Sequence, residues 1–65
     1  MEVRQAELER TMGGTFLVTW IPADLARVGA TLVHKSGVEW HVRQAYKLTM
    51  NHDDLAHEWR VGGLS

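Results

Sequence analysis

The sequence predicts a small α+β domain, in which an antiparallel β-sheet of three to four strands packs with a C-terminal helix. Two observations predict the sheet: apolar and polar residues alternate over residues 30–48, and β-branched and aromatic residues fill residues 15–21. One observation predicts the helix, because Leu55 and Trp59 lie four residues apart behind a pair of acidic residues. The last strand is long enough to bend, so the sheet can curl into a partly closed barrel.

Length and composition limit the kind of protein this is. The chain has 65 residues and no cysteine, which excludes a disulfide or a thiolate metal site. A domain of this size buries only about 60% of the surface of its unfolded chain, and its three tryptophans are natural core anchors. The net charge of −1 is not typical of a nucleic-acid-binding domain. No apolar run approaches the roughly 20 residues that span a bilayer, so we expect a soluble, cytoplasmic protein without membrane contact.

Residues 2–10 contain good helix formers and no breaker, and they predict a short N-terminal helix. Its thin apolar stripe consists of Val3, Ala6 and Leu8, so the segment is either docked on the body or a partner, or frayed. Gly13 and Gly14 follow as a joint. We therefore divide the chain into an N-terminal helical segment and joint (1–14) and a single α+β domain (15–65), which could be complete without the first eleven residues.

The first predicted strand covers residues 15–21 and is bounded by glycine before it and proline after it. Phe16, Val18 and Trp20 share one face, while Leu17 and Ile21 share the other. Because both faces are apolar, we expect this strand to lie in the centre of the sheet. Residues 23–27 follow the proline as one or two helical turns or a tight turn.

The break at residues 35–37 determines the register of the central hairpin. A two-residue loop would pair Val33 with Trp40 and would mix the polar and apolar faces. A three-residue loop, with Gly37 in the left-handed conformation, pairs Leu32 with Trp40 and keeps one continuous apolar face. We predict the three-residue loop.

The C-terminal helix is predicted over residues 51–60, with Thr49 or Asn51 as its cap and two aspartates in its first turn. It should close one side of the sheet. The predicted core consists of the large apolar residues of these elements: Phe16, Val18, Trp20, Leu25, Leu32, Val38, Trp40, Val42, Tyr46, Leu55 and Trp59.

No group of residues predicts catalysis. The histidines at positions 34, 41, 52 and 57 do not converge in the predicted fold, so no metal or other cofactor is expected. Ser36 is explained by its turn, and Asp53 and Asp54 by the start of the helix. Neither glycine pair has the spacing of a phosphate-binding loop. The sequence therefore predicts no enzyme and no small-molecule substrate.

The chain resembles a group of short, uncharacterised bacteriophage proteins over residues 20–46. The shared pattern is Trp20-Ile21-Pro22, Ala26, Val28-Gly29, Leu32 and Trp40-x-Val42. In that group the C-terminal tail is longer and more charged, and residues 1–14 have no counterpart. The resemblance implies a phage origin and a small non-catalytic role in the host cytoplasm, and it carries over no binding or catalytic residue.

The leading functional hypothesis is a protein-interaction module, a small phage accessory protein that binds itself or a host protein. Apolar residues beyond those the core needs, and one histidine at the end of the apolar face, are the candidate partner-binding residues: Val3, Leu8, Leu17, Ile21, Val33 and His34. The alternative is a nucleic-acid-binding accessory or transcriptional regulator that uses Lys35, Arg43 and Lys47 on the outer face of the hairpin. Ionic strength distinguishes the two, since only phosphate binding weakens steeply with salt.

Overall fold

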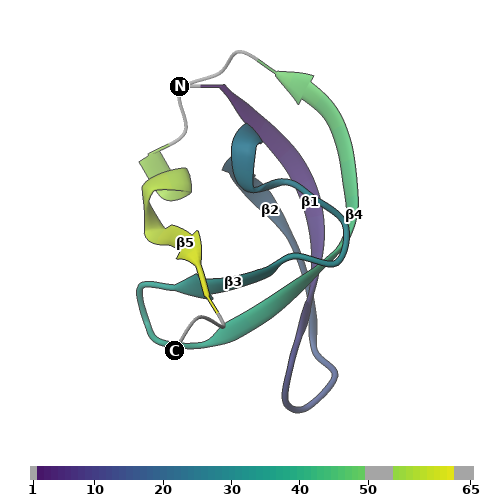
Figure 1. Cartoon of the computed structure of the whole chain (residues 1–65), viewed down its shortest axis with the longest axis vertical. Coiled ribbons are helices and arrows are strands. Elements are labelled where there is room, and N and C mark those ends of the chain that lie inside the picture. Colours follow the sequence, from purple (N-terminus) through teal and green to yellow (C-terminus); the bar gives the residue numbers. More distant parts are fainter. Residues whose placement is uncertain (1, 50–53, 63–65) are drawn as a thin grey trace.

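A computed structural model describes residues 2–49 and 54–62, and these residues form a nearly all-β fold (Figure 1). Five antiparallel strands make one sheet in the order β2-β1-β4-β3-β5, curled into a half-barrel. The strands are β1 (Val3–Arg10), β2 (Phe16–Pro22), β3 (Thr31–His34), β4 (Glu39–Thr49) and β5 (Trp59–Val61). Two 3-10 helices connect them, η1 (Ala23–Leu25) after β2 and η2 (Asp54–Glu58) before β5.

The α+β prediction is wrong, and the N-terminal segment is the first reason. Residues predicted as a helix form β1, which lies between β2 and β4 and pairs with both. A helix of this length is marginal in water, whereas the strand gains hydrogen bonds on both edges and buries Val3, Ala6 and Leu8 completely. Pairing with distant strands therefore overrides the helix propensity of the segment.

The predicted C-terminal helix is the second error. Residues 51–53 lie outside the described residues, and from Asp54 the chain forms η2 and then β5. β5 pairs with β3, so that Trp59 lies opposite His34. Trp59 is 7% exposed and reaches the core from a strand. The spacing of four residues between Leu55 and Trp59 was therefore not the sign of an α-helix. The side chain of Leu55 lies outside the described part.

The register of the central hairpin is confirmed. Leu32 pairs with Trp40, and the N–H of His34 donates to the carbonyl of Val38 at 2.9 Å. Gly37 has a φ of 92°, the left-handed conformation that the three-residue loop requires.

The two-residue alternation fails within β4 because of a β-bulge, the first of two register shifts between β4 and β1. Leu8 of β1 pairs with Val42, and Ala6 pairs with Ala45, so β4 carries one more residue than β1 over this interval. The bulge transfers the inward-facing positions from even to odd numbers. Tyr46, which was predicted in the core, is consequently 43% exposed.

The core lies inside the curl of the sheet. Its largest fully buried side chains come from four different strands: Val3, Leu8, Ile21, Leu32 and Val42. One contiguous cluster contains Ala6, Leu8, Ile21, Leu32, Val42 and Trp59. Leu25 and Trp40 pack against it while half-buried. η2 packs against β2 and β5, and its Ala56 is completely buried. None of the helices in the described ranges is long and apolar enough to cross a membrane.

Two predicted core residues, Phe16 and Val18, are on the surface. They are 59% and 53% exposed, because they lie on the face of β2 opposite to the buried Ile21; β2 is also an edge strand and not the central strand of the sheet. Its inward face carries Ile21, which is fully buried. β1 separates β2 from β4, and β4 is the middle strand of the five.

Candidate interaction surface

The first half of β2 is an open, apolar sheet edge. Within the described residues, β2 pairs only with β1, and the exposed fractions of Phe16, Leu17 and Val18 are 59%, 36% and 53%. Residues 15–21 contain no charged residue, and proline stands only at the end of the strand. Natural edge strands are usually protected by charges, proline or bulges. This edge lacks such protection over the run that is most exposed.

The backbone groups on the open side of β2 belong to alternate residues. At one end of the β1–β2 ladder, the N–H of Arg10 donates to the carbonyl of Thr15 at 2.7 Å. At the other end, the N–H of Ala23 donates to the carbonyl of Glu2 at 3.0 Å. The register between them has no shift, and bonded and non-bonded pairs alternate in an antiparallel ladder. The odd-numbered residues of β2 therefore form the backbone hydrogen bonds to β1. Three even-numbered residues direct their N–H and C=O groups to the open side: Phe16, Val18 and Trp20.

These open-side groups are not used within the described part of the chain. η2 packs against β2, but no backbone hydrogen bond among the described residues joins η2 to β2. Pro22 follows Trp20 and offers a carbonyl but no N–H. The hydrogen-bonding edge therefore begins at Phe16 and ends at Trp20.

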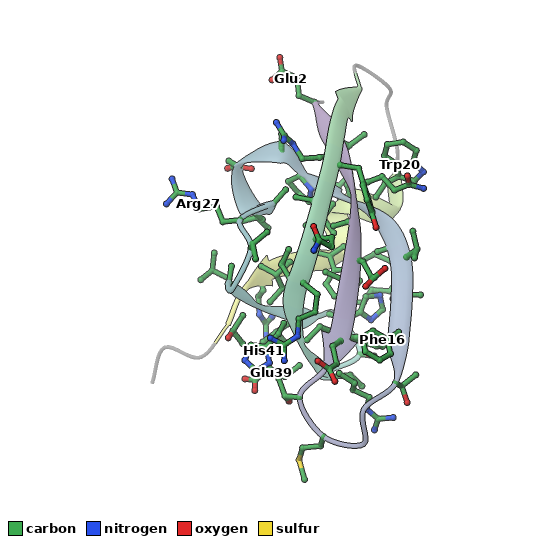
Figure 2. All side chains as sticks on the ribbon, turned by 90° about the vertical axis from the view of Figure 1, so that its right-hand side faces the viewer. Glu2, Phe16, Trp20, Arg27, Glu39 and His41 are labelled. Carbon is green, nitrogen blue, oxygen red and sulfur yellow. The ribbon has the colours of Figure 1, made fainter. Side chains whose placement is uncertain are left out.

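The side chains of the same three residues share the outer face of β2; Phe16 and Val18 are more than half exposed, and Trp20, near the other end of the strand, is half-buried (Figure 2). Glu9 lies opposite Phe16 on β1, and Glu7 lies opposite Val18. Both glutamates contact β4: Arg43 donates from Nε to Glu9 at 2.6 Å, and the Tyr46 hydroxyl lies 3.5 Å from Glu7. The acidic side chains therefore engage β4 and leave Phe16 and Val18 uncovered.

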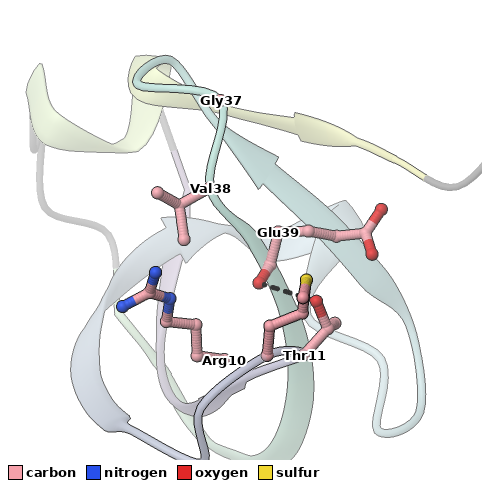
Figure 3. Close-up of a pocket in the computed structure, with 6 residues that line it drawn as sticks. Arg10, Thr11, Gly37, Val38 and Glu39 are labelled. Atoms are coloured by element: carbon pink, nitrogen blue, oxygen red, sulfur yellow. Dashed lines mark hydrogen bonds between the residues drawn. The ribbon is translucent and has the colours of Figure 1, made fainter.

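An open pocket of about 370 Å³ lies where the β1–β2 turn approaches the β3–β4 turn (Figure 3). The N–H of Thr11 donates to the carbonyl of Glu39 at 3.1 Å and joins the two turns. Two charged residues of opposite sign line the pocket, Arg10 and Glu39, together with Thr11, Met12, Gly37 and Val38. The lining has no nucleophile–base pair, and Met12 is 78% exposed at its rim. This pocket offers no arrangement for catalysis.

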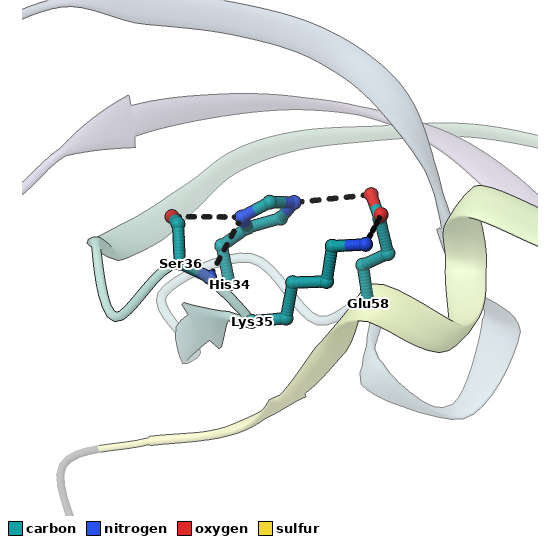
Figure 4. Close-up of polar contacts among 4 residues, drawn as sticks. All are labelled: His34, Lys35, Ser36 and Glu58. Carbon is teal, nitrogen blue, oxygen red and sulfur yellow. Dashed lines mark hydrogen bonds and ion pairs between the residues drawn. The ribbon is translucent and has the colours of Figure 1, made fainter.

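A polar cluster connects the β3–β4 turn to η2 (Figure 4). Glu58 accepts from Lys35 Nζ at 2.6 Å and lies 3.1 Å from His34 Nε2. On the other side of the ring, Nδ1 accepts from the backbone N–H of Ser36 at 3.2 Å and lies 2.8 Å from the Ser36 hydroxyl. We therefore assign the ring proton to Nε2, which donates it to Glu58. The imidazole also meets the ring of Trp59 edge-on, with centroids 4.9 Å apart.

The order serine, histidine, carboxylate does not make this cluster a hydrolytic site. An acyl-transfer site needs N–H donors aimed at a developing oxyanion, but the N–H groups of this turn are already used. Ser36 donates to His34 Nδ1, Gly37 donates to the carbonyl of His34 at 2.8 Å, and Lys35 donates to the carbonyl of Glu58 at 2.8 Å. The cluster instead fastens η2 and β5 to the turn.

Glu58→Gln is expected to lower the Tm at neutral pH, with a difference from wild type that shrinks in acid. Hydrogen bonds from Lys35, and then from His34, hold the pKa of Glu58 below its ordinary value. The ionised carboxylate therefore stabilises the folded state above the ordinary pKa of a glutamate, and this contribution is lost as the pH falls through the lowered folded pKa. Thermal unfolding followed against pH measures the effect, with the exposed Glu2→Gln as control. A pH-independent difference would contradict this assignment.

Of the predicted partner-binding residues, one lies at the open edge. Val3, Leu8 and Ile21 are fully buried and belong to the core. Val33 is half-buried on β3, between Glu39 and Arg60 of the neighbouring strands, and His34 belongs to the Glu58 cluster. Leu17 is the member of the set that β2 exposes. Sequence reasoning missed its exposed neighbours, and the one available signal was the absence of charge across the whole strand.

The residues proposed for nucleic-acid binding do not form a free basic patch in the described structure. Lys35 is paired with Glu58, and Arg43 is paired with Glu9. The side chain of Lys47 lies outside the described residues. To bind nucleic acid, each of these two cations would have to exchange its carboxylate partner for a phosphate. This requirement weakens the argument for nucleic-acid binding at this face.

Neither a metal-binding cluster nor a similar known protein gives a further indication of function. Among the residues that the structure describes, no group of three or more histidines or carboxylates is placed to hold a metal ion. No family model, no curated protein and no solved structure matches this chain.

Proposed function

We propose that this chain is a non-catalytic protein-interaction module that binds an extended protein segment by adding it as a strand to the free edge of β2. The observation that carries the proposal is the coincidence of two features on the same residues. Phe16, Val18 and Trp20 direct N–H and C=O groups to the open side, and two of these side chains are more than half exposed. Main-chain hydrogen bonds supply affinity in strand addition, and alternate side chains supply selectivity.

The chemistry of the edge restricts what it binds. Residues 15–21 are uncharged, and the outward side chains are large and apolar. A favourable partner segment is therefore extended, uncharged and rich in β-branched or aromatic residues, since such cross-strand pairs stabilise a sheet. In keeping with the resemblance to short bacteriophage proteins, we assign the chain the role of a small phage accessory protein in the host cytoplasm.

Nucleic-acid binding remains the competing proposal, and no specific contact favours it. Lys35 and Arg43 are held by carboxylates at 2.6 Å. Complex formation at the β2 edge should be nearly independent of salt, whereas phosphate binding should weaken steeply between low and high ionic strength. A salt titration of any complex of this protein separates the two.

Val18→Pro is expected to retain the fold and to weaken peptide binding about tenfold or more. A loss of this size corresponds to one hydrogen bond whose contribution is at the upper end of the usual range. The N–H of Val18 points to the open side, so proline removes no bond of the β1–β2 ladder, and proline is tolerated on edge strands in this orientation. The probes are fluorescent heptapeptides that alternate valine and threonine, and the measurement is fluorescence anisotropy. The same peptides N-methylated on alternate residues should also bind more weakly.

Leu17→Pro is the matched control, because Leu17 belongs to the set that bonds to β1. Proline at this position removes a ladder hydrogen bond, so we expect a lower Tm than in Val18→Pro. Equal stability of the two proline variants would contradict the assignment of the open side. Undiminished peptide binding by Val18→Pro, or no binding of any such peptide to the wild-type protein, would contradict strand addition.

A further inference from the structure

We propose that the segment bound at the β2 edge is β2 of a second copy of this chain, paired antiparallel across a two-fold axis at Val18. This inference rests on the proposed function and names its partner. It follows from the pattern of open-side backbone groups, the charges around the strand and the contrast between the two edges of the sheet.

One two-fold register uses every open-side group. With Val18 opposite Val18 of the second copy, Phe16 lies opposite Trp20 at both ends, and each of these pairs exchanges two hydrogen bonds. A shift by two residues in one direction places Phe16 opposite Pro22, which has no N–H to donate. A shift in the other direction places Trp20 opposite Gly14, whose φ of 65° is not extended. The strand is therefore self-complementary in the register centred on Val18.

The side chains support the same register. Phe16, Val18 and Trp20 share the outer face, so two aromatic pairs would flank a central valine pair, a favourable combination across antiparallel strands. No charge lies within residues 15–21, so the seam contains no like-charge contact. The nearest acidic row, Glu7 and Glu9 on β1, would face its counterpart across three strand spacings, about 14 Å. That separation exceeds the screening length of about 8 Å at physiological ionic strength.

The two edges of the sheet differ in a way that favours a closed dimer over an open array. The opposite edge strand, β5 (Trp59–Val61), has three residues and includes the charged Arg60. β2 has seven residues and no charge. Pairing of β2 with β2 therefore forms more hydrogen bonds than pairing of β2 with β5, and a two-fold interface of this kind closes on itself. The contact is small, so we expect a dimer that dissociates on dilution.

Disulfide trapping tests the axis, because the chain has no cysteine of its own. In Val18→Cys, the two thiols of a dimer would stand on facing residues about 5.5 Å apart at Cα, within disulfide range. In the control, Phe16→Cys, the two cysteines would stand roughly 14 Å apart, four residues along the strand. Both positions are more than half exposed, so both variants should fold like the wild type. Sedimentation of the wild-type chain over a wide concentration range accompanies the trapping.

We expect Val18→Cys to form a disulfide-linked dimer at least about tenfold faster than Phe16→Cys under mild oxidation, and the wild-type mass to rise toward that of a dimer with concentration. Equal trapping rates at the two positions would overturn the register. A mass of one chain at all concentrations, with slow trapping at both positions, would overturn the second copy as partner. Binding of foreign peptides in the anisotropy assay would then still support the proposed function, so the two failures are distinguishable.

Discussion

Removal of residues 1–11 is expected to abolish the folded state. β1 is an interior strand of the half-barrel and pairs with β2 on one side and β4 on the other. Its deletion removes Val3, Ala6 and Leu8, three of the eight fully or almost fully buried apolar residues of the described chain. It also leaves both neighbouring strands without a partner on that side.

The expected size of this effect follows from burial alone. Burying one valine or leucine side chain contributes about 1.5–3 kcal/mol, and a chain of this length has a total stability of roughly 3–10 kcal/mol. Losing two such side chains costs about 3–6 kcal/mol, a large part of that total, and the loss of two hydrogen-bonded ladders adds to it. Far-UV circular dichroism and thermal unfolding of the fragment 12–65 measure the outcome. A cooperative transition in that fragment would show that β1 is dispensable.

Trp59→Ala is expected to lower the free energy of unfolding by about 3–5 kcal/mol, as truncation of large buried aromatic residues usually does. Trp59 is 7% exposed and opens β5, the last strand of the sheet. Its ring meets His34 and Trp40 edge-on, with centroids 4.9 and 6.3 Å away. Removing it takes away the side chain through which β5 reaches the core.

Tyr46→Ala is the matched control for that change. Tyr46 is also aromatic, but it is 43% exposed on the outward face of β4. Its truncation should cost less than about 1 kcal/mol, within the usual range for surface positions. Chemical denaturation of both variants gives the comparison. A loss in Trp59→Ala no larger than the loss in Tyr46→Ala would mean that β5 is not held by its tryptophan.

The central hairpin could be predicted because its determinants are local. Gly37 restricts the turn, and the alternation around it allows one register with a continuous apolar face. β1 could not be predicted in this way. Its residues favour a helix when considered alone, and its strand conformation depends on pairing Leu8 with Val42, more than thirty residues away. Sequence periodicity does not reveal such a partner.

The open edge of β2 was missed for a related reason. An uncharged strand with apolar residues on both faces is typical of a buried central position, and the sequence does not state the order of strands in a sheet. Once β1 lies between β2 and β4, the same residues face outward. The bulge in β4 had a similar effect on Tyr46, because one additional residue reversed the faces between the first and the second register shift. In both cases the error came from long-range pairing and not from local propensity.

Residue-resolved amide hydrogen exchange along β2, measured at low and high protein concentration, tests the central claim most directly. In dilute solution, the amides of Leu17 and Thr19 should exchange slowly because they bond to β1, and those of Phe16, Val18 and Trp20 should exchange fast. At high concentration the three fast amides should become protected while the rest of the sheet is unchanged. Protection of all β2 amides at every dilution, or fast exchange of the even-numbered amides at every concentration, would contradict an open edge that binds a second copy.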